Sequence, residues 1–157
     1  MALRKIVTRE DEVLRKNCKP VEKFDEKLWQ LLDDMAETMY KAEGYGLAAP
    51  QIGIIRKICV IDVGEGLIEL INPMILEFSL ETERGTEGCL SCPGEWGYVT
   101  RPKKVKFRAQ DRNGEFYEKE VTDMFARCVC HETDHLKGQL FTDIADEMID
   151  EEELEKE

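Results

Sequence analysis

Histidine is scarce in this chain of 157 residues, which contains only His131 and His135. Long apolar runs are lacking as well: none approaches the ~18 residues of a membrane-spanning helix, and the first residues show no apolar stretch typical of a signal peptide. Repeats and low-complexity linkers are also missing. These absences argue against a membrane protein or a chain of several domains. We expect a cytoplasmic protein whose six cysteines stay reduced.

The two histidines stand close together in the run His131-Glu132-Thr133-Asp134-His135. On an α-helix, residues four apart lie on one face, so both imidazoles can bind a single metal ion. Glu132 lies beside them, where it can take the proton of a metal-bound water. Such pairs also occur on solvated helix faces, but apolar neighbours predict that this helix is partly buried. The run is therefore typical of a metal-dependent hydrolase.

The residues around this run predict a helix over 124–136. That span has no Gly or Pro, Thr122 or Asp123 can cap its start, and Gly138 can end it.

A catalytic site of this kind uses three protein ligands and leaves the fourth position for water. With no histidine left, the third ligand must be Cys, Asp or Glu. Cys128 lies too far from His135 along the helix, a rise of about 10.5 Å, and Cys130 points to another side. Cys89 and Cys92 are the better candidates. A zincin-type endopeptidase is disfavoured, because its usual third ligand lies further downstream and no histidine follows His135.

The pair Cys89-x-x-Cys92 leaves alternatives open. With the two histidines it could form a closed structural zinc site in a metal-stabilised binding module, or it could be a redox motif. However, Pro93 favours an extended Cys92, and in an extended run residues 89 and 92 face opposite sides. No helix pattern begins at Cys92, as a redox motif would require. The residues favour an open three-ligand site through Cys89 and keep the closed site as the alternative.

Apolar periodicity predicts an α+β fold. A helix is expected over 25–43, with Asp25 as its N-cap and Gly44 as its stop. Strands are expected over 57–63, 68–71 and 74–79, and a hairpin over 103–110 and 115–121 turns at Asn113-Gly114. The expected architecture is a set of antiparallel strands packed around a central metal-binding helix, with an N-terminal helix beside them.

Three blocks of the chain, in this order, closely resemble the signature motifs of peptide deformylases. They are Gly44-Tyr45-Gly46-Leu47-Ala48-Ala49-Pro50-Gln51, Glu87-Gly88-Cys89-Leu90-Ser91 and the run from His131 to His135. The resemblance continues between the blocks, for example at Ile71-Asn72-Pro73 and Arg101-Pro102, and reaches to about Phe141.

This resemblance implies a function and a set of ligands. The reaction would be hydrolysis of the N-formyl group from the N-terminal formylmethionine of newly made polypeptides, releasing formate. By resemblance, Cys89, His131 and His135 hold one divalent metal ion, Fe(2+), which Ni, Co or Zn can replace. Glu132 would take the water's proton and deliver one to the leaving amine.

The resemblance also implies roles around the metal. The Gln51 side chain and the Leu90 backbone N–H would stabilise the oxyanion, while Tyr45 and Gly46 would contact substrate. Glu87 and Arg101 are expected to pair and orient the Cys89 segment, with an ordinary surface ion pair as the alternative. Three residues depart from the family pattern. Cys92 stands where an aliphatic residue is usual, and Cys130 stands where glutamine is frequent. The third is Arg127, whose guanidinium group could reach the methionine pocket or whose aliphatic chain could cover apolar surface.

Negative charge is concentrated at the C-terminal end. Residues 143–157 hold nine acidic residues and one basic residue, a net charge of −8 out of −12 for the chain. We expect residues 1–142 to form a single catalytic metallohydrolase domain and 143–157 to form a solvated acidic tail, with a short helix as the alternative. The expected partner is an N-formyl-Met peptide at the nascent chain terminus, with transient proximity to the ribosome. No membrane and no direct nucleic-acid binding are expected, because RNA phosphates would repel such a tail.

Overall fold

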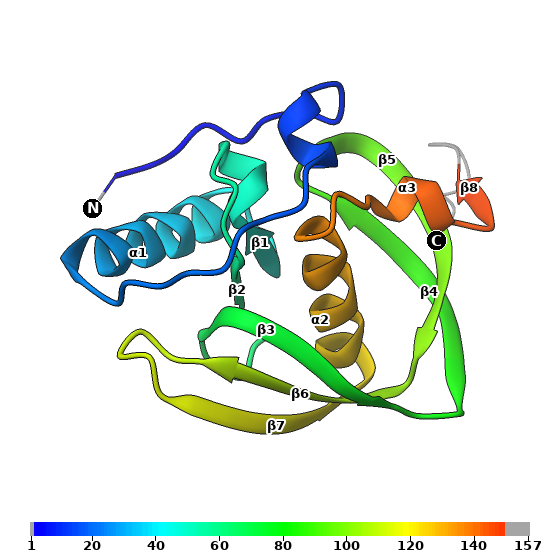
Figure 1. Cartoon of the computed structure of the whole chain (residues 1–157). Coiled ribbons are helices and arrows are strands. Elements are labelled where there is room, and N and C mark those ends of the chain that lie inside the picture. Colours follow the sequence, from blue (N-terminus) through cyan, green and yellow to red (C-terminus); the bar gives the residue numbers. More distant parts are fainter. Residues whose placement is uncertain (1, 150–157) are drawn as a thin grey trace.

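The central element of this computed structural model, which describes residues 2–149, is the helix α2. Figure 1 shows α2 (Asp123–His135) between two antiparallel sheets. The five-stranded sheet has the order β1-β2-β3-β6-β7, and the three-stranded sheet has the order β4-β5-β8. The strands are β1 (Gly46–Ala48), β2 (Ile58–Ile61), β3 (Ile68–Phe78), β4 (Thr82–Cys89), β5 (Cys92–Pro102), β6 (Lys104–Gln110), β7 (Phe116–Thr122) and β8 (Glu147–Ile149). The expected α+β architecture around a central helix is confirmed.

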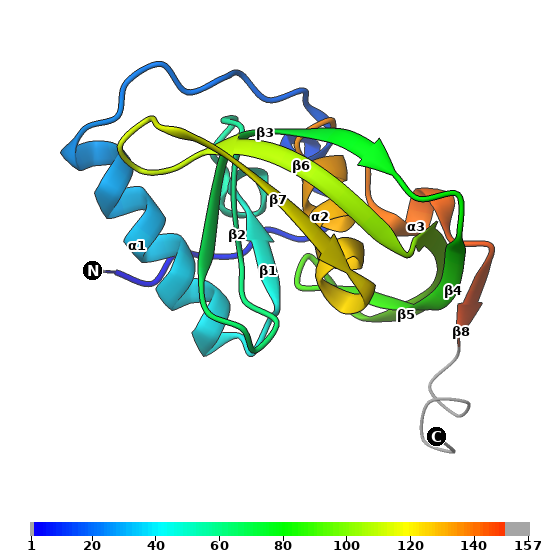
Figure 2. The same cartoon turned by 90° about the horizontal axis from the view of Figure 1, so that it is seen from below.

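The remaining helical elements lie on the outside of this arrangement. Helix α1 (Glu26–Lys41) lies along β1 and β2, as both views show (Figures 1 and 2), and short helix α3 (Phe141–Ile144) follows α2. Two 3₁₀ turns, η1 (Glu12–Arg15) and η2 (Ala49–Ile52), complete the fold. None of the described helices is long and apolar enough to cross a membrane.

Helix α1 forms where the apolar stripe predicts it. The Asp25 side chain accepts a hydrogen bond from the Leu28 backbone N–H and so caps the first turn. One face buries Leu28, Leu32, Met35 and Met39 against β1 and β2. The helix ends at Lys41, slightly before the expected boundary, because frayed last turns are not fixed by periodicity.

Helix α2 is buried on nearly all sides, because the β6–β7 hairpin and the β4–β5 hairpin pack on different faces of it (Figure 2). Thr122 is the N-cap residue, although its side chain makes no capping hydrogen bond. After the helix, Gly138 adopts a φ of +79°. A Cβ at this glycine would lie 2.5 Å from the Arg15 carbonyl oxygen, so the turn that ends the α2 region needs glycine for two reasons.

Two sequence-based boundaries are wrong. The strands expected over 68–71 and 74–79 form one strand, β3, whose register with β6 shifts after Ile71. Residues 143–149 form ordered structure, although most of their side chains are exposed: β8 pairs with β5 through Trp96 and Ile149, and Asp143 forms an ion pair with Arg15. Neutralising partners elsewhere in the chain let this acidic segment pack. The expectation for residues 150–157 lies outside the described residues.

Candidate active site

Three side chains that can bind a metal converge where β4 meets α2. Cys89 is the last residue of β4, and His131 and His135 lie one turn apart on α2. Their ligand atoms lie within 4.8 Å of one another, and they form the one such group among residues 2–149. Cys89 Sγ is 3.3 Å from His135 Nε2. A thiolate and two imidazoles suit Zn, Fe, Ni or Co, so the donor set fits a divalent transition metal.

Cys92 lies next to this group but outside it. The chain turns at Leu90-Ser91, and Cys89 and Cys92 are directly opposite partners in the β4–β5 ladder. The expectation that the two residues lie on one extended run and face opposite sides is therefore wrong, because it ignored a turn between them. The neighbouring Cys92 thiol and burial raise the pKa of Cys89. The ligand atoms that converge are those of a three-ligand site, without Cys92.

Glu87 is the centre of a buried ionic cluster beside the ligands. Its carboxylate accepts hydrogen bonds from Arg101 at 2.9 and 3.0 Å and from Arg127 Nη1 at 2.7 Å, and it lies 2.8 Å from His131 Nδ1. Burial would raise the pKa of Glu87, but His131 and Arg101 outweigh it and hold this pKa well below its usual range. The contact occupies Nδ1 of His131, which leaves Nε2 as the nitrogen free to bind a metal.

The two histidines differ in their electrostatic surroundings. Burial and the charges of His131 and Arg101 lower the pKa of His135 well below its usual value, so its imidazole is neutral, as a ligand must be. Burial also acts to lower the pKa of His131, but the carboxylates of Glu132 and Glu87 outweigh it and raise this pKa. A cation is therefore favoured at His131, whether it is a proton or a metal ion.

Glu132 is buried beside Cys89, His131 and His135 and has an unpartnered carboxylate oxygen. Burial raises its pKa to about 7, with the charge of His131 opposing the shift. Its Oε1 is inaccessible and has no hydrogen-bond partner among the described residues. A buried carboxylate oxygen without a partner is costly unless a water or ion completes the site. The orphaned oxygen therefore fits a site that holds a metal and its water.

Gly46 fixes how closely the first strand approaches Glu132. A Cβ at Gly46 would lie 2.5 Å from Glu132 Oε2, so no larger residue fits without displacing the carboxylate. The close approach expected from the sequence was to a peptide substrate. The structure shows that the contact on the Cβ side of Gly46 is the Glu132 carboxylate.

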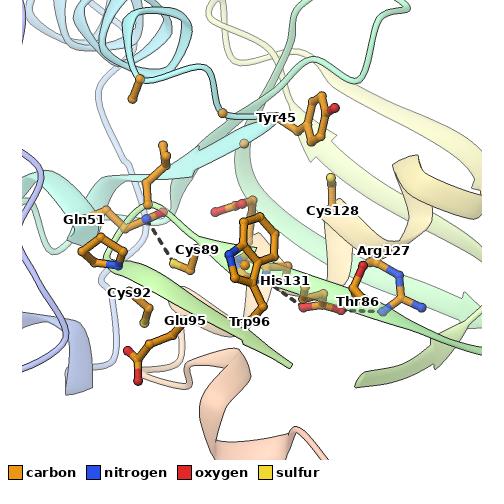
Figure 3. Close-up of a pocket in the computed structure, with 18 of the residues that line it drawn as sticks. Tyr45, Gln51, Thr86, Cys89, Cys92, Glu95, Trp96, Arg127, Cys128 and His131 are labelled. Atoms are coloured by element: carbon orange, nitrogen blue, oxygen red, sulfur yellow. Dashed lines mark hydrogen bonds and ion pairs between the residues drawn. The ribbon is translucent and has the colours of Figure 1, made fainter. Parts of the chain in front are cut away.

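Gln51 is held with its amide nitrogen directed at the ligands. Its Oε1 accepts from the Ala48 backbone N–H at 2.9 Å, and its Nε2 lies 3.2 Å from Ser91 Oγ and 3.5 Å from Cys89 Sγ. Figure 3 shows this contact between Gln51 and Cys89 at the edge of the cavity. The neighbouring Leu90 stands at the turn between β4 and β5 and lines the same cavity.

A cavity of about 620 Å³ opens beside the ligands. Tyr45 stands on its rim and is 59% exposed, and α2 contributes Met124 and Cys128 to its wall. Figure 3 shows side chains from β1, the β4–β5 hairpin and α2 around it. The volume and the mixture of apolar wall and polar end are typical of a binding site for a small ligand.

Sequence reasoning missed the role of Arg127. Its head does not extend freely into the cavity, because Nη1 also donates to the Val99 carbonyl and Nη2 donates to the Glu83 carbonyl. The available signal was an arginine on a helix face predicted to be buried, which requires a carboxylate partner. Asp134, which lies between the two histidines along α2, accepts a hydrogen bond from Arg101 Nη1 at 2.7 Å.

Comparison with known proteins gives one consistent family. The model of the family described as polypeptide deformylase matches residues 3–151. A peptide deformylase of Caldicellulosiruptor bescii is 55% identical over 156 residues, which cover 99% of this chain and 93% of that protein. The crystal structure of peptide deformylase from Thermotoga maritima superposes with a TM-score of 0.90 at 46% identity, covering 91% of this chain and 97% of that one. A Synechococcus elongatus peptide deformylase, solved in complex with actinonin, gives 0.87 at 40% identity, covering 96% and 81%.

Proposed function

This chain belongs to the polypeptide deformylase family, which removes the formyl group from N-formylmethionine peptides, and we propose that Cys89, His131 and His135 hold the metal ion of that reaction. When bound, a divalent cation supplies Lewis acidity that lowers the pKa of water and polarises the formyl oxygen. We propose Fe(2+) as the ion in the cell. Ni, Co and Zn are suitable replacements because each accepts imidazole and thiolate.

Glu132 is the proposed proton carrier. Its carboxylate stands beside the ligands with one oxygen unpartnered, and a pKa raised by burial favours a group that both accepts and returns a proton near neutral pH. It would take the proton of the attacking water and deliver it to the amine nitrogen as the formyl C–N bond breaks.

Gln51 and Leu90 are the proposed donors to the oxygen that becomes negative during attack. Gln51 Nε2 already points at Cys89, and the fixed Oε1 contact prevents the amide from flipping. The backbone N–H of Leu90 follows Cys89 directly along the chain. Donors held in place before the reaction stabilise such an oxyanion without reorganisation.

Tyr45 and Gly46 are proposed to contact the substrate backbone at the mouth of the cavity, and the cavity itself would receive the methionine side chain. Glu87 and Arg101 would orient His131 and the Cys89 strand. The substrate would be the amino terminus of a nascent chain, met in the cytoplasm during transient proximity to the ribosome. Six free thiols are consistent with a reducing compartment.

The observation that carries this proposal is the convergence of three ligand atoms beside a buried carboxylate with an unpartnered oxygen. The test is hydrolysis of a short N-formyl-Met peptide by metal-loaded protein purified without oxygen. Glu132→Gln should lower kcat by about 10²–10⁴-fold while the bound metal, measured by elemental analysis, stays near one equivalent. Retained turnover, or loss of the metal, would contradict the role given to Glu132.

Cysteine variants separate an open site from a closed one. Cys89→Ser should release most of the metal and activity, because a hydroxyl replaces a thiolate. Cys92→Val should keep both, since the ligand atoms converge without it. A closed site with four ligands makes the opposite prediction for Cys92→Val, in which the metal would leave and the melting temperature would fall.

A further inference from the structure

The two thiols at the β4–β5 turn are placed for a bond that the deformylation chemistry does not use. Cys89 and Cys92 are directly opposite cross-strand partners. Such partners have Cα atoms about 4.5–5.5 Å apart, which lies inside the range of about 4.4–6.8 Å that disulfides span. Both side chains pack in the same cluster, with Leu14, Val99 and Leu140. No change of backbone register is needed to join them.

Access to the two thiols is unequal. Cys89 is partly exposed and lines the cavity beside Gln51 (Figure 3). Cys92 also belongs to the cavity wall, but it is only 1% exposed and packs among Leu14, Val99 and Leu140. A small oxidant that enters the cavity therefore reaches Cys89 first, and Cys92 stands behind it as the nearest thiol. This is the arrangement of an attacked cysteine with an adjacent resolving cysteine.

We propose that, when no metal protects Cys89, a peroxide entering the cavity converts Cys89 and Cys92 into a reversible disulfide. In the first step the Cys89 sulfur attacks the peroxide O–O bond, giving a sulfenic acid and releasing water or an alcohol. In the second step the Cys92 sulfur attacks the Cys89 sulfur, the S–O bond breaks, and water leaves with the proton of the Cys92 thiol. In total, two thiols lose two electrons and the peroxide gains them.

The disulfide would keep Cys89 in an oxidation state from which a reductant can restore the thiol. A sulfenic acid without a neighbouring thiol proceeds to sulfinic and sulfonic acids, which are not reduced back by thiols. Cys92 would intercept that path, and a dithiol reductant would then restore Cys89. The bond itself depends only on the turn geometry, but its effect on metal uptake rests on the proposed role of Cys89 as a ligand.

The other cysteines are poorer candidates for the same reaction. Cys128 also lines the cavity, but Cys130, two residues further along α2, points to a different side of the helix. Cys18 and Cys59 are buried in the core under the five-stranded sheet. They provide internal controls, because a non-selective oxidation would involve them as well.

The experiment treats the full chain, stripped of metal by a chelator, with one equivalent of hydrogen peroxide. The wild type should lose two of its six thiols and about 2 Da, and non-reduced peptide mapping should join the peptides that hold Cys89 and Cys92. Dithiothreitol should restore all six thiols and the uptake of zinc. Cys128→Ala should give the same cross-link. Cys92→Val, treated with an excess of peroxide that takes Cys89 past the sulfenic acid, should instead gain mass in steps of about 16 Da and stay unable to take up zinc after reduction.

Two results would overturn the proposal: a cross-link that maps to another cysteine pair, or oxygen addition at Cys89 in the wild type without any loss of the Cys92 thiol. Mapping in the wild type decides this even if Cys92→Val folds poorly. Prior saturation with zinc should slow cross-linking. If the cross-link forms equally fast with zinc bound, the disulfide stands and the role of Cys89 as a metal ligand fails, so the two proposals fail separately.

Discussion

Two clusters of arginines and carboxylates start from the same strand, β4, and differ in burial far more than in distance. Glu87 binds Arg101 at 2.9 Å, and both side chains are less than a tenth exposed. Arg84, three residues earlier, binds Asp146 at 2.8 Å, and both of these are nearly half exposed. Alternation along the strand turns Glu87 toward α2 and Arg84 toward solvent.

The comparison shows that the distance between two charged groups does not measure how much their ion pair contributes to stability. Water screens the Arg84 cluster, and such exposed pairs contribute little to stability. In the Glu87 cluster, two guanidinium groups and an imidazole are buried with one carboxylate. Removing that carboxylate would leave buried positive charge without a counterion. The buried cluster should therefore be sensitive to single substitutions, and the exposed cluster should tolerate them.

The largest effect is expected for Glu87→Gln, which keeps the shape of the side chain and removes its charge. We expect the free energy of unfolding, measured by urea denaturation, to fall by about 3–5 kcal/mol. Metal affinity, measured by titration, should fall about 10–100-fold because His131 loses its orienting partner. Glu147→Gln in the exposed cluster is the matched control. Equal effects of the two substitutions would show that burial does not decide how sensitive the two clusters are.

The pH dependence of the free energy of unfolding should sharpen the comparison between the two clusters. The folded pKa of Glu87 is depressed, so its contribution is complete above the unfolded value of about 4.3 and is lost as the pH falls through the folded pKa. The folded pKa of His131 is raised, so its contribution is complete below about 6.5 and is lost as the pH rises through the folded pKa. In metal-free protein, the stability difference between wild type and Glu87→Gln should be largest between these two pH values. A difference that is flat from pH 4 to pH 8 would speak against coupled charges.

Truncation of the C-terminal strand tests the region around the exposed Arg84 cluster. Removing residues 147–157 deletes β8, and with it Ile149, which is only 6% exposed. The free energy of unfolding should fall by about 1.5–3 kcal/mol, the cost of losing one buried aliphatic side chain. Activity on short N-formyl-Met peptides should persist below the melting temperature, because every ligand precedes residue 136. Removing only residues 150–157 is the control. Loss of activity in a folded truncated protein would show that β8 shapes the cavity.

The smallest effect is expected for Arg84→Gln. This guanidinium is exposed, so its loss should leave the urea midpoint within experimental error at moderate salt. Raising the salt concentration should remove whatever difference remains, because exposed charges are screened over about 3 Å at 1 M. A large destabilisation that persists at high salt would show that this cluster, too, behaves as a buried one.

Elements that depend on local signals could be predicted from the sequence. Helix α2 could be predicted from the i and i+4 histidines and an uninterrupted helical span, and the β6–β7 hairpin could be predicted from Asn113-Gly114, because both signals lie within a few residues. The Glu87–Arg101 pair was expected either beside the Cys89 segment or on the surface, and the structure shows it buried. The catalytic roles of the site residues remain predictions.

Features that depend on distant partners could not be predicted. Strand β4 is rich in Glu, Gly and Thr and has no apolar alternation, so its pairing with β5 is fixed by the fold around it. The same holds for β8, which lies in the acidic segment that was expected to be a solvated tail. In the structure β8 pairs with β5 at Trp96, and its Glu147 forms an ion pair with Arg84. The composition of a segment indicates its own conformational preference, whereas these two strands form because neighbouring strands pair with them.

The distance along the chain between the metal ligands has a consequence for folding kinetics. Cys89 and His135 are 46 residues apart, and β5, β6 and β7 lie between them. Contacts of such separation form late, because the intervening loops must close first. The ligand set is therefore complete only near the native end of the folding reaction. A metal that binds this set should slow unfolding and leave the refolding rate almost unchanged, so the ion would extend the lifetime of the folded chain without guiding its formation.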